Sequence, residues 1–218
     1  AQYVTRKGIQ TYESLAWLNG EKIVVICDNP CVGIKSIGYR QSGYDTSPEG
    51  TFTCSDDFYN RFWQKALNTL YVNMRDTFFD CPDRERSQWW GDVVVLMNEC
   101  FYSYSTSTHA LMRKAIRELC EWAAPDGTLH SPVPGTYNKE LPGQMLAAVG
   151  VYGFWTYYMN TGDLETLKMA YPVVKKYLSL YEIDESGLTK YRKGGWNWGD
   201  WGKNKDMTLI YSLCHSLA

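Results

Sequence analysis

Two kinds of helical segment alternate along the chain beyond Ser55, and this alternation constrains the possible folds most strongly. Segments of the first kind carry an apolar stripe on one face and polar side chains elsewhere, and they span residues 56–78, 108–124 and 163–182. Segments of the second kind are apolar almost all round, and they span residues 88–105, 143–160 and 207–218. A helix without a polar face must be covered on most sides, whereas an amphipathic helix faces solvent. The order therefore predicts an inner layer of apolar helices wrapped by an outer layer of amphipathic helices.

This two-layered order favours a toroid of helical hairpins over a plain helical bundle, because most helices of a bundle are amphipathic. Acidic residues mark the expected helix starts at Asp56, Asp163 and Asp206, since an Asp side chain accepts hydrogen bonds from the free N–H groups of the first turn. Pro172 is expected to kink its helix. About six helices fit the pattern, and a closed toroid normally needs more. We therefore expect the sequence to hold only part of its domain.

Residues 1–54 show a different pattern, which is typical of β-strands. Residues 14–18 and 21–27 flank Asn19-Gly20, a hairpin turn signal, and a second turn leads into residues 32–40. The change of pattern predicts two parts, a β part over residues 1–54 and a helical part over residues 55–218.

Composition excludes several classes of partner. The 218 residues carry a formal net charge of -2 with both signs interspersed, so nucleic acid is not expected to bind. No apolar run is long enough to cross a bilayer, and the first residues lack the profile of a signal peptide. We therefore expect a partner that is neither nucleic acid nor membrane.

The cysteines indicate free thiols. There are seven, an odd number, without Cys-x-x-Cys pairs, so a structural zinc site is not expected. Several lie in apolar helical settings, where a thiol behaves as a small hydrophobic group. We expect no metal and no cofactor, and a soluble protein of a reducing compartment, with the cytoplasm favoured over the periplasm.

Residues 80–92 hold the densest set of reactive side chains. Four carboxylates, two arginines and two tryptophans occupy these thirteen positions. Carboxylates this close have unequal pKa values, because like charges and burial raise one pKa while a nearby guanidinium lowers another. Such a set favours general-acid chemistry, and indole faces pack well against sugar rings. The alternative is a charged loop whose arginines and carboxylates pair at the start of a helix.

The same segment resembles a known signature. Asp80-Cys81-Pro82 followed by Glu85-Arg86-x-x-Trp89-x-Gly91-Asp92 resembles the signature of the bacterial α-L-rhamnosidases of glycoside hydrolase family 78. Residues 38–55, 161–163 and 198–201 also look like landmarks of that family. The commoner form of the signature has one more residue between its Cys-Pro and Glu-Arg pairs, which leaves the roles of Asp83 and Arg84 less defined.

The resemblance implies a fold and a reaction. Residues 1–54 would be the C-terminal part of a β-sandwich domain with its linker, and residues 55–218 the N-terminal half of an (α/α)6 catalytic barrel of the six-hairpin glycosidase type. The reaction would be inverting hydrolysis of terminal α-L-rhamnose from glycosides or polysaccharides. Two carboxyl groups, roughly 6.5 to 9.5 Å apart, would act as the acid and the base of this reaction.

The resemblance also assigns roles. Glu85 would be the general acid, with Asp80 and Asp92 as catalytic or substrate-binding support. The family's base lies far downstream in the second half of the barrel, and Glu99, Glu140 and Glu165 are poor substitutes. The chain by itself is therefore expected to be inactive.

Substrate contacts are expected from two regions. The candidates are Arg84, Trp89, Trp196, Trp198 and Asp200. Trp196 or Trp198 could form an apolar wall for the sugar, on a glycine-flanked loop, and the alternative is a tryptophan plug at the barrel end. Residues 131–143 could form part of the rim.

Two alternatives to the function stay open. The chain could belong to another (α/α)6 glycosidase with different sugar specificity, or it could be a non-catalytic carbohydrate-binding relic. In each case the expected partner is a carbohydrate, and the resemblance specifies a rhamnose-containing oligosaccharide or glycoside.

Overall fold

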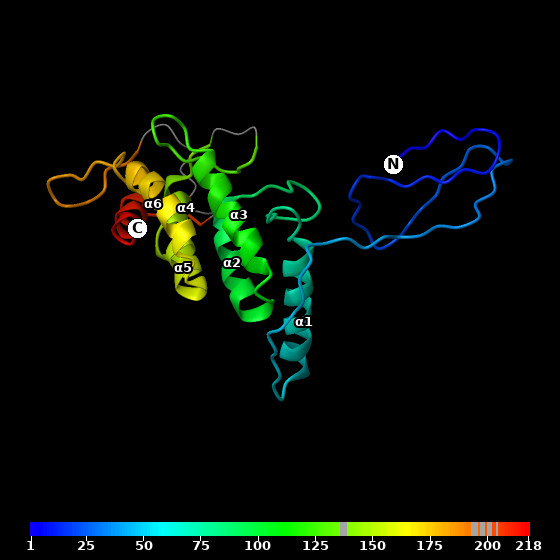
Figure 1. Cartoon of the computed structure of the whole chain (residues 1–218), viewed down its shortest axis with the longest axis horizontal. Helices are drawn as coiled ribbons and strands as arrows, with labels where there is room; N and C mark the ends of the chain where they lie inside the picture. Colours follow the sequence, from blue (N-terminus) through cyan, green and yellow to red (C-terminus); the bar gives the residue numbers. More distant parts are fainter. Residues whose placement is uncertain (136–138, 193–195, 197–198, 200–201, 204) are drawn as a thin grey trace. The chain divides into compact units, whose positions relative to one another are not determined.

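The computed structural model describes residues 1–135, 139–192, 196, 199, 202–203 and 205–218. It divides into two compact units, Ala1–Gln41 and Ser42–Ala218. Figure 1 shows the chain coloured along its sequence, with the first unit in blue.

The first unit has no regular secondary structure. The strands expected over residues 14–18 and 21–27 do not form, and the apolar side chains of Leu15, Val24 and Ile26 are exposed. A strand needs a paired neighbour for its backbone groups and a layer to cover its apolar face, and residues 1–41 supply neither within their own unit. The assignment of residues 1–54 to a β-sandwich stays a prediction.

Residues 42–54 belong to the helical unit. The backbone N–H groups of Glu49 and Gly50 both donate to the carbonyl of Ser103, at 3.0 Å each. The Tyr44 hydroxyl donates to the carbonyl of Ser107 at 2.8 Å. These bonds join the segment to a helix corner, so the compact helical unit begins before the expected boundary at residue 55.

The described part of the helical unit is built from helices. Their bounds are α1 (Asp57–Val72), α2 (Trp90–Ser103), α3 (Thr108–Glu121), α4 (Pro142–Val149), a π-helical turn (Val151–Trp155), α5 (Thr156–Thr161), α6 (Leu164–Leu178) and α7 (Met207–Ser216). The predicted starts at Asp56, Asp163 and Asp206 are confirmed. Each of these side chains accepts a hydrogen bond from a backbone N–H of the first turn of its helix.

Two expected helices differ from the structure. The first ends at Val72 instead of residue 78, and the chain then turns back in an isolated bridge between Met74 and Phe78. The segment expected over residues 143–160 is broken, because the backbone of Gly150 leaves the helical conformation (φ -96°, ψ -142°) between α4 and the π-helical turn. Pro172 lies inside α6, which continues past it.

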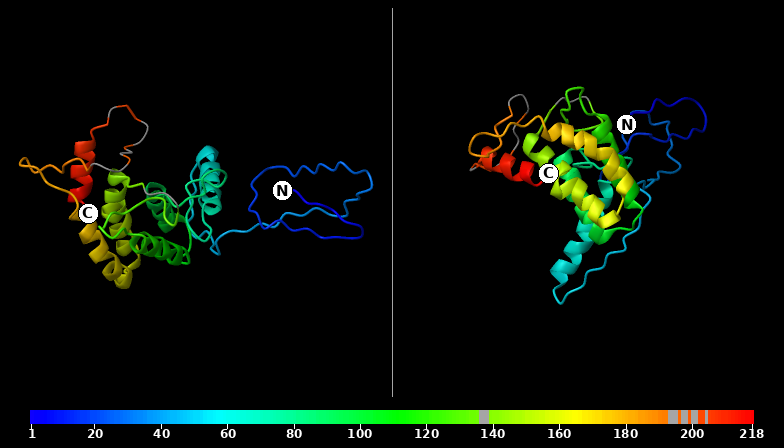
Figure 2. Two further views of the ribbon diagram at one scale, coloured as in Figure 1. Left: turned by 90° about the horizontal axis from the view of Figure 1, so that it is seen from above. Right: turned by 60° about the vertical axis from the view of Figure 1, so that its left-hand side comes forward.

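The helices form two layers. In the inner layer α4 packs against both α2 and α7, and in the outer layer α3 packs against α6. Figure 2 shows α7, in red, beside the yellow-green helices of the unit. The core between the layers is mainly apolar and includes Trp90, Met97, Met112, Leu119 and Leu146. Inner apolar and outer amphipathic helices therefore alternate as predicted, in an incomplete α/α toroid.

Three loops lead from an outer helix to the next inner helix. We name them loop A (residues 73–89), loop B (residues 122–141) and loop C (residues 179–206). Gln88 of loop A donates to the carbonyl of Val133 in loop B at 2.6 Å, and Trp196 of loop C donates its backbone N–H to the carbonyl of Glu140 at 3.0 Å. The described parts of the loops therefore meet at one end of the helices (Figure 1).

Candidate active site

Residues 80–87 of loop A form a closed turn ahead of α2. The backbone N–H of Asp80 donates to the carbonyl of Ser87 at 3.0 Å, and the Ser87 N–H returns a bond to Asp80 Oδ1 at 2.9 Å. Arg86, whose φ is 53°, donates its Nε–H to the carbonyl of Pro82 at 2.9 Å. Left-handed backbone is uncommon outside glycine, so this loop is held in a specific shape.

Glu85 stands on the solvent side of this turn. Its Oε2 accepts a hydrogen bond from the indole N–H of Trp89 at 2.9 Å, and its Oε1 accepts one from Arg84 at 2.9 Å. Both side chains of the Arg84–Glu85 pair are exposed. If the pair breaks, neither charge is left buried without a partner. Trp89 directly precedes α2 and is half-buried, so the better-fixed of the two partners is the indole.

Asp92 lies in the first turn of α2. Solvent reaches the side chain, yet surrounding protein partly desolvates its carboxyl, and this raises the pKa of Asp92. The negative charges of Asp80 and Glu85 raise it further. Asp92 is therefore affected by the charges of both carboxylates with which it was predicted to act.

The start of α2 is tied to loop B by residues that the sequence did not single out. Gln88 is buried and donates to Glu118 Oε2 at 3.0 Å as well as to Val133. The backbone N–H of Trp90 donates to the hydroxyl of Ser131 at 3.0 Å. These partners lie at least 30 positions away along the chain, so no local pattern could have indicated them.

A cation lies between two tryptophans of the site. The Lys139 ammonium is 5.9 Å from the ring centroid of Trp89 and 4.9 Å from that of Trp196. Both distances are within the range of cation–π attraction. Loop B therefore brings the predicted aromatic wall at Trp196 toward the predicted acid region.

Glu140, the next residue, is buried and fully engaged. Arg192 Nε lies 2.9 Å from its Oε1 and 3.0 Å from its Oε2. The hydroxyls of Tyr177 and Tyr181 also donate to Oε1, at 3.0 and 3.3 Å. Burial raises the pKa of Tyr177 well above its ordinary value. A carboxylate held by these four contacts anchors loops B and C and is unsuited to activate a water molecule.

The remaining candidate residues of the site differ in where they lie. Trp198 and Asp200 lie outside the described residues. Arg84 pairs with Glu85 and is mostly exposed. Glu99 is exposed on α2, and Glu165 is exposed on α6 in a pair with Lys168.

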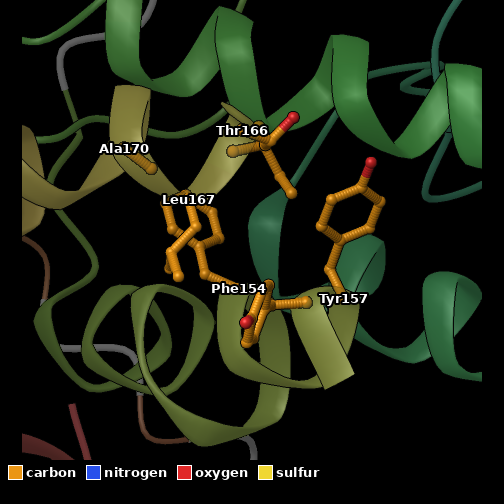
Figure 3. A pocket seen from close by; sticks show the side chains of 7 residues that line it. Phe154, Tyr157, Thr166, Leu167 and Ala170 are labelled. Carbon is orange, nitrogen blue, oxygen red and sulfur yellow. The ribbon is translucent and has the colours of Figure 1, made fainter. Parts of the chain in front are cut away.

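A small cavity lies away from these carboxylates. Figure 3 shows Phe154 and Tyr157 on one side of it and Thr166, Leu167 and Ala170 of α6 on the other. Its volume of about 10 Å³ has room for one water molecule. This cavity is too small for a sugar ring, and no residue of the segment 80–92 lines it.

Within the part of the chain that the structure describes, no three His, Cys, Asp or Glu side chains are placed so that they could share a metal ion. Neither is there a described helix with the length and apolar character that crossing a bilayer requires.

A protein-family model and a known protein both match this chain, and both are described as alpha-L-rhamnosidases. Residues 47–210 match the bacterial alpha-L-rhamnosidase 6 hairpin glycosidase domain. An alpha-L-rhamnosidase of Formosa agariphila is 25% identical over an alignment of 171 residues, and the match covers 70% of this chain and 17% of that protein. The chain thus spans about a sixth of this curated relative.

Solved structures of rhamnosidases also resemble this chain. The crystal structure of a GH78 family rhamnosidase of Bacillus sp. GL1 superposes with a TM-score of 0.66 and 28% identity, over 74% of this chain and 17% of that one. A rhamnosidase from Klebsiella oxytoca with rhamnose bound has the same fold, with a TM-score of 0.64 and 21% identity, over 74% of this chain and 33% of that one. Because the match to the domain covers most of the sequence, the chain belongs to the bacterial α-L-rhamnosidase six-hairpin glycosidase domains of glycoside hydrolase family 78.

Proposed function

We propose that this chain supplies the general acid of an inverting α-L-rhamnosidase, and that Glu85 is that acid. The observation that carries the proposal is the placement of Glu85. It is accessible at the end of the toroid where the loops meet, its Oε2 accepts a hydrogen bond from the Trp89 indole, and its negative charge acts on Asp92. The membership of the chain in a rhamnosidase family supplies the sugar.

In the proposed reaction Glu85 gives its proton to the glycosidic oxygen as the bond to the anomeric carbon breaks. A water molecule attacks that carbon from the opposite face, and a second carboxylate takes a proton from the water. The two carboxyl groups need roughly 6.5 to 9.5 Å between them to admit the water. We assign the second carboxylate to a later part of a longer protein, as the family resemblance implies, because Glu140 is buried and Glu99 and Glu165 lie on helices.

Asp80 and Asp92 have different parts in this proposal. Asp80 accepts from Ser87 and from the Cys81 thiol, so it shapes the acid loop. Asp92 is open to solvent and can accept charge-assisted hydrogen bonds from sugar hydroxyls. Trp196, which is 47% exposed, offers an apolar face to the sugar ring.

The test uses Glu85→Gln in the longer protein that carries this chain. We expect turnover of an alkyl α-L-rhamnoside to fall about 10² to 10⁴-fold, because its leaving group must be protonated. An aryl rhamnoside with an acidic phenol should lose much less. Glu121→Gln, at an exposed position at the end of α3, is the matched control and should leave both rates unchanged.

Three results would contradict the proposal. Equal losses on both leaving groups would show that Glu85 does not donate the proton. If a panel of chromogenic glycosides shows hydrolysis of another sugar but not of rhamnose, the enzyme has a different specificity. If none of the glycosides is hydrolysed, a carbohydrate-binding protein is favoured.

A further inference from the structure

The Lys139 side chain links residues from all three loops. Trp89 comes from loop A, Lys139 from loop B and Trp196 from loop C, and the ammonium lies within 6 Å of both ring centroids. Indole has the most favourable aromatic face for a cation. One ammonium therefore attracts two rings from loops that lie far apart in the sequence.

The backbone around this contact is fixed on both sides. The carbonyl of Lys139 accepts from the backbone N–H of Ser131 at 2.9 Å, and the Ser131 hydroxyl in turn accepts from Trp90. On the other side, Glu140 is anchored by Arg192, and its carbonyl accepts from the Trp196 N–H. The side chain of Lys139 thus starts from a backbone position that is tied to both tryptophan-bearing loops.

The contact continues to the proposed acid. The indole N–H of Trp89 donates to Glu85 Oε2 at 2.9 Å. A ring held by a cation on its face has less freedom to turn, so its N–H keeps one direction. Trp196 remains 47% exposed, which leaves part of its surface for a ligand.

From these contacts we propose that Lys139 is a positioning residue, which holds Trp89 and Trp196 as one aromatic wall and orients Glu85 through Trp89. Its effect on catalysis rests on the function proposed above. Its effect on the two rings does not depend on that function and can be measured separately.

The first measurement is ¹⁹F NMR of the longer protein labelled with 5-fluorotryptophan. The resonances of Trp89 and Trp196 are assigned with Trp89→Phe and Trp196→Phe. We expect Lys139→Met, which keeps the length of the side chain and removes its charge, to shift both resonances. Lys139→Arg should restore them in part, because a guanidinium also stacks on aromatic rings. Lys168→Met, at an exposed position on α6, is the control and should shift neither.

The second measurement is kinetic. Lys139→Met should lower kcat/KM on an alkyl rhamnoside by roughly 3- to 30-fold, the factor that corresponds to the usual strength of a cation–π contact. The loss should be larger on the alkyl than on the aryl substrate, since proton donation is affected, and Lys139→Arg should recover most of it. The melting temperature should change by no more than about 1 °C, which separates positioning from a folding defect.

The two measurements test different parts of the inference. If neither resonance moves in Lys139→Met, or only one does, the inference is wrong whatever the activity. If both move but kcat/KM stays at the wild-type value, the positioning role is wrong. If the wild-type protein does not hydrolyse rhamnosides, the proposed function fails, and the NMR result still decides whether Lys139 joins the two rings.

Discussion

Asp92 shows at the scale of one residue how the site differs from an ordinary helix start. A carboxylate in the first turn is normally favoured by the helix dipole. Here partial desolvation and the charges of Asp80 and Glu85 outweigh that benefit and raise the pKa of Asp92. Groups with perturbed pKa values are common at functional sites, where stability is given up for chemistry.

Asp92→Asn tests this residue. The folded state holds the Asp92 proton more tightly than the unfolded state does, so ionisation destabilises the fold as the pH rises through the raised pKa. Asn removes that penalty, and the melting temperature of the variant should exceed the wild-type value at about pH 7 and approach it at about pH 4. Activity on rhamnosides should fall about 10- to 100-fold through the lost charge-assisted hydrogen bond.

Asp57→Asn is the matched control, because Asp57 also lies in the first turn of a helix, α1, but does not belong to the carboxylates of the site. It should leave activity unchanged and should not raise the melting temperature. A lower melting temperature for Asp92→Asn at neutral pH would show that Asp92 serves the fold.

Among the elements, α6 has the most elaborate start. The Asp163 carboxylate accepts from the Thr166 hydroxyl, from the Tyr157 hydroxyl and from Arg113, each at 2.7 Å, and from the Thr166 N–H at 3.1 Å. Burial alone would raise the pKa of Asp163, but these hydrogen bonds together hold it well below its ordinary value. The cap therefore joins the outer helices α3 and α6 through Arg113.

Asp163→Ala should lower the free energy of unfolding by about 1 to 3 kcal/mol, through the lost cap and the lost charge-assisted bonds. Because the folded-state pKa is depressed, this stabilisation is complete above the ordinary Asp pKa and declines as the pH falls from there toward the folded-state pKa. Urea unfolding between about pH 7 and about pH 3 should therefore show the difference between wild type and variant narrowing at the acid end. Asp163→Asn keeps a cap acceptor and should lie between them, and a constant difference at every pH would contradict the explanation.

The helical unit as a whole separates scaffold from site. The inner helices α2, α4 and α7 and the inward faces of the outer helices α3 and α6 supply the packed core, and loops A, B and C carry the proposed acid, the positioning lysine and the aromatic wall. Such a division lets loops vary while the two layers keep their packing. It also means that each loop depends on its neighbours for its shape.

We expect residues 1–218 expressed alone not to hydrolyse an aryl α-L-rhamnoside, because the second carboxylate of the proposed mechanism is assigned to a later part of a longer protein. The longer protein, assayed beside it at equal molar concentration, is the reference. Circular dichroism and gel filtration would establish whether the shorter chain is folded and monomeric. A folded monomer with activity equal to the reference would place the base within these residues and overturn the proposed division.

The sequence by itself determined the helical class, the alternation of inner and outer helices, and the starts at Asp56, Asp163 and Asp206, because apolar periodicity and caps act over a few neighbouring residues. It also indicated the segment 80–92, whose composition and family signature are local. The break at Gly150 and the unpaired state of residues 14–27 were decided by tertiary structure, since a helix bend and a strand both depend on what packs against them. The same holds for Lys139 between two tryptophans and for the buried pair of Glu140 and Arg192, whose partners lie more than 45 positions apart along the chain. Cation–π contacts and buried ion pairs are interactions in space, and only the folded loops bring these charges and rings together.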